Sequence, residues 1–236
     1  MMKRLFFELF VLVATTLIMP EATIARTLHV VPQPAYVELD AEGDYIVTAK
    51  TTIVVQDEAW NPAKRFAEDM MTYFNLNKPM KSAKRGKGIK LRIDRFVAEE
   101  GYEMTIDSEG ILIIGGSEAG IYYGLQSLRQ MVEASPAVPH CHIEDSPAYG
   151  YRGVLIDISR HFRTVEFLKR QIDMMARFKM NRLHLHLTDA AGWRIECESY
   201  PRLHTYAAWR TPATWKEWWY GDRKHVEEGS TDAHGG

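Results

Sequence analysis

Two charged side chains, Arg160 and Asp189, each follow a short apolar, strand-like segment, residues 154–158 and 183–187. The planar guanidinium of an arginine can donate two parallel hydrogen bonds to adjacent hydroxyls, which lysine does less well. A carboxylate accepts hydrogen bonds. The two groups therefore indicate a site for a polar ligand. The structural alternatives are that Arg160 pairs with Asp157 or Asp189 at the rim of a sheet, or that Asp189 is a helix N-cap.

The segment between the two apolar runs has the spacing of a helix. Its apolar residues recur three or four positions apart, at Val165, Leu168, Ile172, Met175 and Phe178. Strand, helix and strand in this order predict two parallel strands with a right-handed crossover. In barrels built from such units the catalytic groups lie at the C-terminal strand ends. We therefore expect Arg160 and Asp189 to share one pocket.

Several motifs of this region resemble glycoside hydrolase family 20, the β-N-acetylhexosaminidases. They are RGVLIDISRHF, MARFKMNRLHLHLTD, GWRIE and SYPRL, and the resemblance covers roughly residues 28 to 210. It implies that Arg160 binds hydroxyls of the terminal sugar and that Asp189 supports a histidine beside the catalytic acid. One departure is Ala190-Ala191, where many members carry Asp-Gln; it puts the local hydrogen bonding in doubt.

The resemblance also implies an activity and a substrate. Glycans ending in β-linked N-acetylglucosamine or N-acetylgalactosamine would be hydrolysed with retention, by substrate-assisted catalysis without a cofactor or metal. The acetamido oxygen of the sugar attacks the anomeric carbon, an aspartate orients the acetamide, and a glutamate acts as acid and then base. The only Asp-Glu pair here is Asp57-Glu58, which lacks the family's surrounding glycines. No role is assigned to it, and we expect this chain to be inactive alone.

The expected fold is an α+β N-terminal domain followed by the first βα units of an incomplete (β/α)8 TIM barrel. The boundaries are 26–146 for the first domain and 147–236 for the second. A complete barrel takes roughly 200 to 400 residues, so the chain is expected to stop inside the barrel, as a fragment or truncated reading frame. The polar tail after Tyr220 has no core pattern.

In the first domain, short strands alternate with turns and two helices. A turn is expected at Glu42-Gly43-Asp44 and a hairpin around Ser108-Glu109-Gly110. The helices are predicted over Asn61–Asn75 and Glu118–Val132. The glycines from Gly115 to Gly120 resemble a phosphate-binding loop but lack the spacing of its motifs. We therefore expect a strand-to-helix turn there.

Residues 1–25 have the pattern of a signal peptide. Lys3 and Arg4 precede an apolar run from Leu5 to Met19, and Thr23-Ile24-Ala25 is a small-residue cleavage site. This predicts an exported protein, periplasmic or secreted. The absence of an Asn-x-Ser/Thr acceptor favours a bacterial source.

Twenty-nine basic and 31 acidic residues give a net charge of −2, so nothing suggests nucleic acid or an anionic membrane as a partner.

Other chemistry-bearing groups have weaker patterns. His184-x-His186 could bind a metal, but no third ligand is placed, and His140-Cys141-His142 lies in an expected Pro-flanked linker. Cys141 and Cys197 could pair in an exported chain, although two cysteines make no framework. The tryptophans near the C-terminus could stack on sugars, although such residues more often pack a loop onto the scaffold.

The rival functions are a non-catalytic carbohydrate-binding protein that reuses residues 26–146 and a non-functional truncated product.

Overall fold

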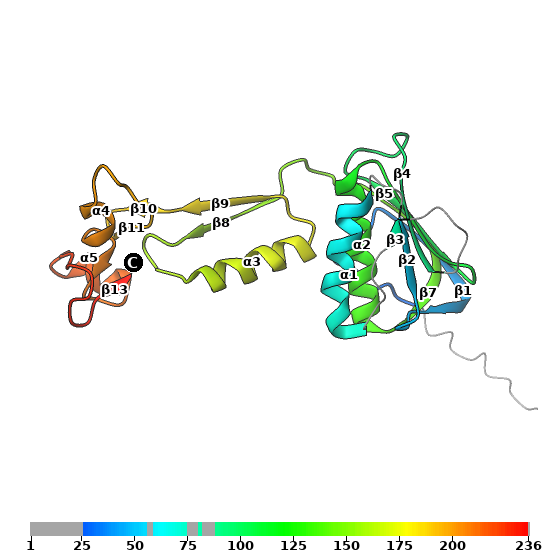
Figure 1. Ribbon diagram of the computed structural model, residues 1–236, viewed down its shortest axis with the longest axis horizontal. Helices are drawn as coiled ribbons and strands as arrows, with labels where there is room; N and C mark the ends of the chain where they lie inside the picture. Colours follow the sequence, from blue (N-terminus) through cyan, green and yellow to red (C-terminus); the bar gives the residue numbers. More distant parts are fainter. Residues whose placement is uncertain (1–25, 56–58, 75–79, 82–87, 236) are drawn as a thin grey trace, which may run out of the picture.

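The computed structural model describes residues 26–55, 59–74, 80–81 and 88–235 (Figure 1). The predicted signal peptide, residues 1–25, and the pair Asp57-Glu58 lie outside these residues. Within the described ranges, no helix has the length and apolar character needed to cross a membrane.

The first part of the chain forms a seven-stranded mixed sheet in the order β1-β7-β5-β6-β4-β2-β3. Its strands are β1 (Tyr36–Ile46), β2 (Thr52–Val55), β3 (Met80–Lys81), β4 (Gly88–Ile93), β5 (Tyr102–Asp107), β6 (Gly110–Gly115) and β7 (Ala137–Asp145). The neighbours from β1 to β6 are antiparallel, whereas β6, β4, β2 and β3 run parallel. Helices α1 (Trp60–Phe74) and α2 (Glu118–Ala134) lie together on one face of the sheet (Figure 1).

Local sequence explains how the central strands and α2 begin and end. The predicted hairpin is confirmed: the Asp107 carboxylate accepts hydrogen bonds from the main chain of Glu109 and Gly110, at 2.7 and 3.1 Å. Ser117 caps α2 by accepting from the amide of Ala119, so the glycines before it form the expected strand-to-helix turn. The core between sheet and helices consists mainly of buried aliphatic residues such as Leu125, with a few aromatic ones such as Tyr102.

Two predictions for the strands β1 and β7 are wrong. Strand β1 runs through the expected turn at Glu42-Gly43-Asp44, because a register shift between Leu39 and Asp44 absorbs those residues as a bulge. The His140-Cys141-His142 segment lies in β7, an inner strand, and not in a linker. Its Pro139 faces the irregular part of β1, where a missing N–H is tolerated.

The two cysteines are unpaired. Cys141 is buried within β7 and Cys197 is partly exposed, and both are free thiols. Burial raises the pKa of the Cys141 thiol to about 12. The alternative of a disulfide between them is therefore wrong.

The second part begins with the predicted parallel unit, β8 (Gly153–Asp157), α3 (Val165–Arg177) and β9 (Arg182–His186). Thr164 caps α3 by accepting from the amide of Phe167. The two strands pair in parallel from Gly153 opposite Arg182 to Asp157 opposite His186, so their C-terminal ends coincide. The unit projects from the sheet domain and carries a small lobe at its far end (Figure 1).

The lobe is built from short elements: β10 (Thr188–Asp189), β11 (Gly192–Trp193), α4 (Arg202–Thr205), β12 (Trp209–Arg210), α5 (Trp215–Tyr220) and β13 (His234–Gly235). The tail after Tyr220 is more ordered than its polarity predicts, because β13 pairs with β12 and His225 contacts the carbonyls of Trp209 and Ala190.

Buried polar contacts join the sheet domain to the parallel unit. Lys179, just after α3, donates from its Nζ to the Asp145 carboxylate at 2.8 Å and to the Tyr102 hydroxyl at 3.2 Å. Arg152, just before β8, donates to the carboxylate of Glu100 at 3.0 Å and to the carbonyl of Lys179 at 2.8 Å. These contacts fix the start of β8 against the sheet domain.

Candidate functional site

The end of β8 holds an arginine in a fixed direction. The amide of Arg160 donates to Oδ1 of Asp157 at 3.0 Å, and its Nη1 donates to Oδ2 of the same carboxylate at 2.5 Å. Asp157 therefore binds both the main chain and the side chain of the residue three positions later. This closes the turn that follows the strand and holds the guanidinium beside the Asp157 carboxylate.

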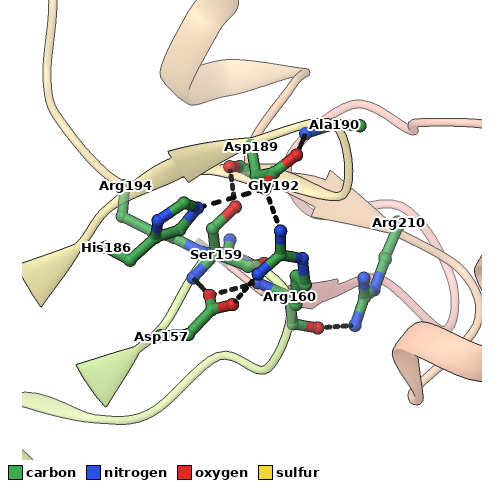
Figure 2. A network of polar contacts seen from close by, with 9 residues as sticks. All are labelled: Asp157, Ser159, Arg160, His186, Asp189, Ala190, Gly192, Arg194 and Arg210. Carbon is green, nitrogen blue, oxygen red and sulfur yellow. Dashed lines mark hydrogen bonds and ion pairs between the residues drawn. The ribbon is translucent and has the colours of Figure 1, made fainter. Parts of the chain in front are cut away.

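The segment just after β9 supplies the second carboxylate. Nη2 of Arg160 donates to Oδ2 of Asp189 at 2.6 Å, and Nε2 of His186 lies 3.1 Å from the same oxygen (Figure 2). The predicted meeting of Arg160 and Asp189 at adjacent strand ends is thus observed. We call Asp157, Arg160, His186 and Asp189 the strand-end site.

The alternative that Asp189 caps a helix is wrong. Asp189 lies in β10, which pairs with β11 in a short hairpin, and its Oδ1 accepts from the amide of Ala190 at 2.6 Å. This amide belongs to the first of the two consecutive alanines, Ala190 and Ala191.

Both carboxyl groups of the strand-end site are held in the charged form. Burial acts to raise the pKa of Asp157, but the main-chain and side-chain hydrogen bonds from Arg160 outweigh it, so the pKa is lowered. The hydrogen bond from the amide of Ala190 is the largest cause of the lowered pKa of Asp189. Burial opposes it, and His186 and Arg160 add to the lowering.

This arrangement can bind a hydroxylated ligand. The Arg160 side chain is 43% exposed and Asp189 31% exposed, so both can reach a molecule from solvent. A guanidinium has five N–H donors, and the two carboxylates use two of them. A sugar hydroxyl both donates and accepts, so it can bridge the free donors of Arg160 and the acceptors of Asp189.

Three further residues support the site from behind. The Ser159 hydroxyl, which is fully buried, donates to the carbonyl of Gly192 at 2.7 Å. In the turn that follows β8, Arg194 donates to the carbonyls of Ile158 and Ser159. Arg210 donates to the carbonyl of Arg160 in the same turn (Figure 2). Sequence patterns gave no signal for these contacts, because the donors and their carbonyl acceptors lie on different elements.

The other candidates are placed in less informative surroundings. Within the part of the chain that the structure describes, no group of three His, Cys, Asp or Glu residues could hold a metal ion. The tryptophans contact their own lobe. Trp218 is buried, and the rings of Trp215 and Trp219 stack with their centroids 5.2 Å apart. The indole N–H of Trp193 donates to the carbonyl of Ile195. These contacts favour the packing interpretation over a sugar platform.

Comparison with known families divides the chain into two matched regions. Residues 27–146 match the model for glycosyl hydrolase family 20, domain 2. Residues 149–228 match the model for the glycosyl hydrolase family 20 catalytic domain.

Curated relatives include a beta-hexosaminidase of Porphyromonas gingivalis, 37% identical over 201 residues, which are 79% of this chain and 26% of that protein. A beta-N-acetylhexosaminidase of Cellulomonas fimi is 33% identical over 74% of this chain and 37% of its own length. The chain thus spans only part of the curated relatives that it matches.

Solved structures show the same fold. A mutant Streptomyces plicatus beta-hexosaminidase in complex with product (GlcNAc) matches with a TM-score of 0.70 and 36% identity, over 77% of this chain and 38% of that one. A Vibrio harveyi exo beta-N-acetylglucosaminidase in complex with N-acetylglucosamine matches with a TM-score of 0.69 and 29% identity, over 78% and 29%. The fold of the matched part is therefore that of known glycosidases. The chain belongs to glycosyl hydrolase family 20.

Proposed function

We propose that the strand-end site binds the terminal sugar of a β-N-acetylhexosaminidase substrate. The glycan would end in β-linked N-acetylglucosamine or N-acetylgalactosamine. Arg160 would donate to adjacent hydroxyls of the terminal sugar, and Asp189 would orient the histidine that serves the catalytic acid. The observation that carries this proposal is the Arg160 guanidinium, fixed between two carboxylates at the ends of adjacent parallel strands.

The histidine that the resemblance places beside the catalytic acid has no matched position in this sequence. Among the described residues, Asp189 contacts His186. Its distance of 3.1 Å allows the ring N–H to donate to the carboxylate, which sets the tautomer and the ring direction. In the proposed reaction the substrate supplies its own nucleophile, the acetamido oxygen, and the bond is cleaved with retention. β8 and β9 would be the first strands of the catalytic barrel.

We expect this chain alone to bind the sugar without hydrolysing it. The Asp-Glu pair that the reaction needs has no assigned position in the sequence, since Asp57-Glu58 lacks the surrounding glycines. Purified chain should therefore release no chromophore from 4-nitrophenyl N-acetyl-β-glucosaminide. Measurable release that disappears in the Arg160→Ala variant would contradict this expectation.

Binding is the sharper test. Titration calorimetry with N-acetylglucosamine should give saturable binding to the full chain. Arg160→Ala should lower the affinity at least about tenfold, because hydrogen bonds from a charged donor contribute about 1.5–3 kcal/mol each. Arg163→Ala is the matched control: Arg163 lies three residues away, is exposed, and stacks on Phe167 at 5.4 Å. Equal affinity in wild type and Arg160→Ala would overturn the proposal.

The same titration separates the rival function. If the sugar binds but the Arg160→Ala variant binds it equally well, the binding surface lies elsewhere and a carbohydrate-binding role of residues 26–146 is favoured. We also propose that the protein is exported, to the periplasm or outside the cell, on the pattern of residues 1–25. N-terminal sequencing of the protein from its native cells should find a mature end near Arg26.

A further inference from the structure

Arg194, from the GWRIE motif, forms no ion pair among the described residues. Its guanidinium instead donates to three main-chain carbonyls. Nε donates to Ile158 at 2.9 Å, Nη2 to Ser159 at 3.1 Å and Nη1 to Ala208 at 2.5 Å. One side chain thus joins the turn after β8 to the segment before β12.

Arg210 makes a second connection of the same kind. It is 2% exposed, and its Nη2 donates to the carbonyl of Arg160 at 2.7 Å. A longer contact of 3.5 Å reaches the carbonyl of Ala191 in the hairpin that carries Asp189. Figure 2 shows the main-chain carbonyl of Arg160 facing Arg210, whereas the guanidinium of Arg160 faces Asp189. Arg210 therefore fixes the main chain of the residue whose side chain reaches the ligand.

Glycines make room for the guanidinium of Arg194. A Cβ atom at position 192 would lie 2.7 Å from Cζ of Arg194 and 2.9 Å from the carbonyl oxygen of Ser159. A Cβ atom at position 235 would lie 2.7 Å from Nη1 of Arg194. All three distances are shorter than real Cβ contacts, so these positions admit only glycine while Arg194 stays in place. This explains why a glycine precedes Arg194 by two residues in the motif.

The hydrogen bonds of Arg194 and Arg210 compensate for the free-energy cost of removing two charged side chains from water. Burial lowers the pKa of Arg194 to about 10, with a further lowering from the positive charge of Arg210. Burial also lowers the pKa of Arg210. A buried cation beside a partly buried one adds little net stability compared with well-packed apolar residues. What they do provide is a set of directed hydrogen bonds to one turn.

We propose that Arg194 and Arg210 are positioning residues that fix the main chain from Ile158 to Arg160 and so direct the Arg160 guanidinium toward the ligand. The part of this proposal that concerns sugar affinity rests on the proposed function. The part that concerns the direction of Arg160 does not, because it is measurable without a ligand.

The test uses the full chain with the substitutions Arg210→Met, Arg210→Lys and, as the matched control, Arg163→Met. The first readout is the guanidinium Nη–H signal of Arg160 in ¹⁵N NMR, because Nη1 and Nη2 donate to the two carboxylates. Arg210→Met should shift or broaden this signal and lower the affinity for N-acetylglucosamine about tenfold. Arg210→Lys should largely keep the wild-type Arg160 signal and the affinity for N-acetylglucosamine, because an ammonium can still donate to the Arg160 carbonyl. Arg163→Met should change neither.

A merely structural role predicts a different result. In that case Arg210→Met would lower the unfolding midpoint, but the folded protein would keep the Arg160 signal and the sugar affinity of the wild type, and the proposal would be overturned. If Arg210→Met does not fold, Arg194→Lys, which keeps the charge but cannot reach three carbonyls, should shift the same signal. If wild type binds no sugar, the proposed function fails, while the Arg160 signal still decides the positioning role.

Discussion

The ion pair between Lys179 and Asp145 gives the most quantitative prediction. Lys179 has φ of +60°, a left-handed conformation that costs a non-glycine residue about 1–2 kcal/mol. It occurs where the chain leaves α3, so that the side chain can enter the sheet domain and reach Asp145. Lys179→Met removes the ammonium but leaves this backbone conformation and most of the side-chain volume unchanged.

The expected cost follows from burial. The two side chains are 8% and 16% exposed, and the atoms of the pair are 2.8 Å apart. In the variant, Asp145 keeps the amide of Ala35 as a donor, at 3.2 Å. Removal of one partner of a buried pair costs about 3–5 kcal/mol. Since one donor and some exposure remain, we expect about 3 kcal/mol.

Urea unfolding followed by circular dichroism measures this cost. Lys224→Met is the control, because Lys224 pairs with Asp222 at the surface with side chains 75% and 81% exposed, and should cost below about 0.5 kcal/mol. The double variant with Asp145→Asn should recover more than half of the loss, since no unpaired charge is then buried. A cost below about 1 kcal/mol for Lys179→Met, or strict additivity with Asp145→Asn, would refute this account of the domain junction.

Three other perturbations have defined outcomes. Leu125→Ala, at a fully buried position of α2, should lower the free energy of unfolding by about 3 kcal/mol. The same change at Leu155, 57% exposed, should cost far less, and equal costs would contradict the assigned core. The folded-state pKa values of Asp157 and Asp189 are lowered, so their contribution to stability is fully present above the unfolded values near 4 and is lost as pH falls through the folded ones. Urea midpoints should therefore drop below about pH 4, and Asp189→Asn should make the drop shallower; an unchanged pH profile would count against this pairing. Thr214→Ala removes the capping box of α5 and should destabilise this helix by about 1 kcal/mol, seen as faster amide exchange confined to the lobe; unchanged exchange would show that the cap contributes little.

Much of the fold follows from short-range patterns in the sequence. The hairpin at Asp107 and the helix starts at Ser117 and Thr164 depend on side chains that bind the main chain two or three residues away. Such contacts leave a local signature. The place of Cys141 in an inner strand does not, because the neighbouring Pro139 is tolerated only through an irregular register with β1.

The strand-end site was predictable in part for a geometric reason. Parallel strands joined by a helix have their C-terminal ends at the same edge, so Arg160 and Asp189 were expected to meet. The exact role of Asp157, which binds both the amide and the guanidinium of Arg160, was only one of the structural alternatives. The contacts of Arg194 and Arg210 are with carbonyls, which every residue carries, so no side-chain pattern marks them.

The most direct test of the central claim is a map of where N-acetylglucosamine binds. We expect amide chemical shifts in a ¹⁵N NMR titration of the full chain to change over residues 157–161 and 186–190, the two strand ends that carry Arg160 and Asp189. Changes that concentrate in residues 26–146, or a titration that moves no signal at either strand end, would contradict the account.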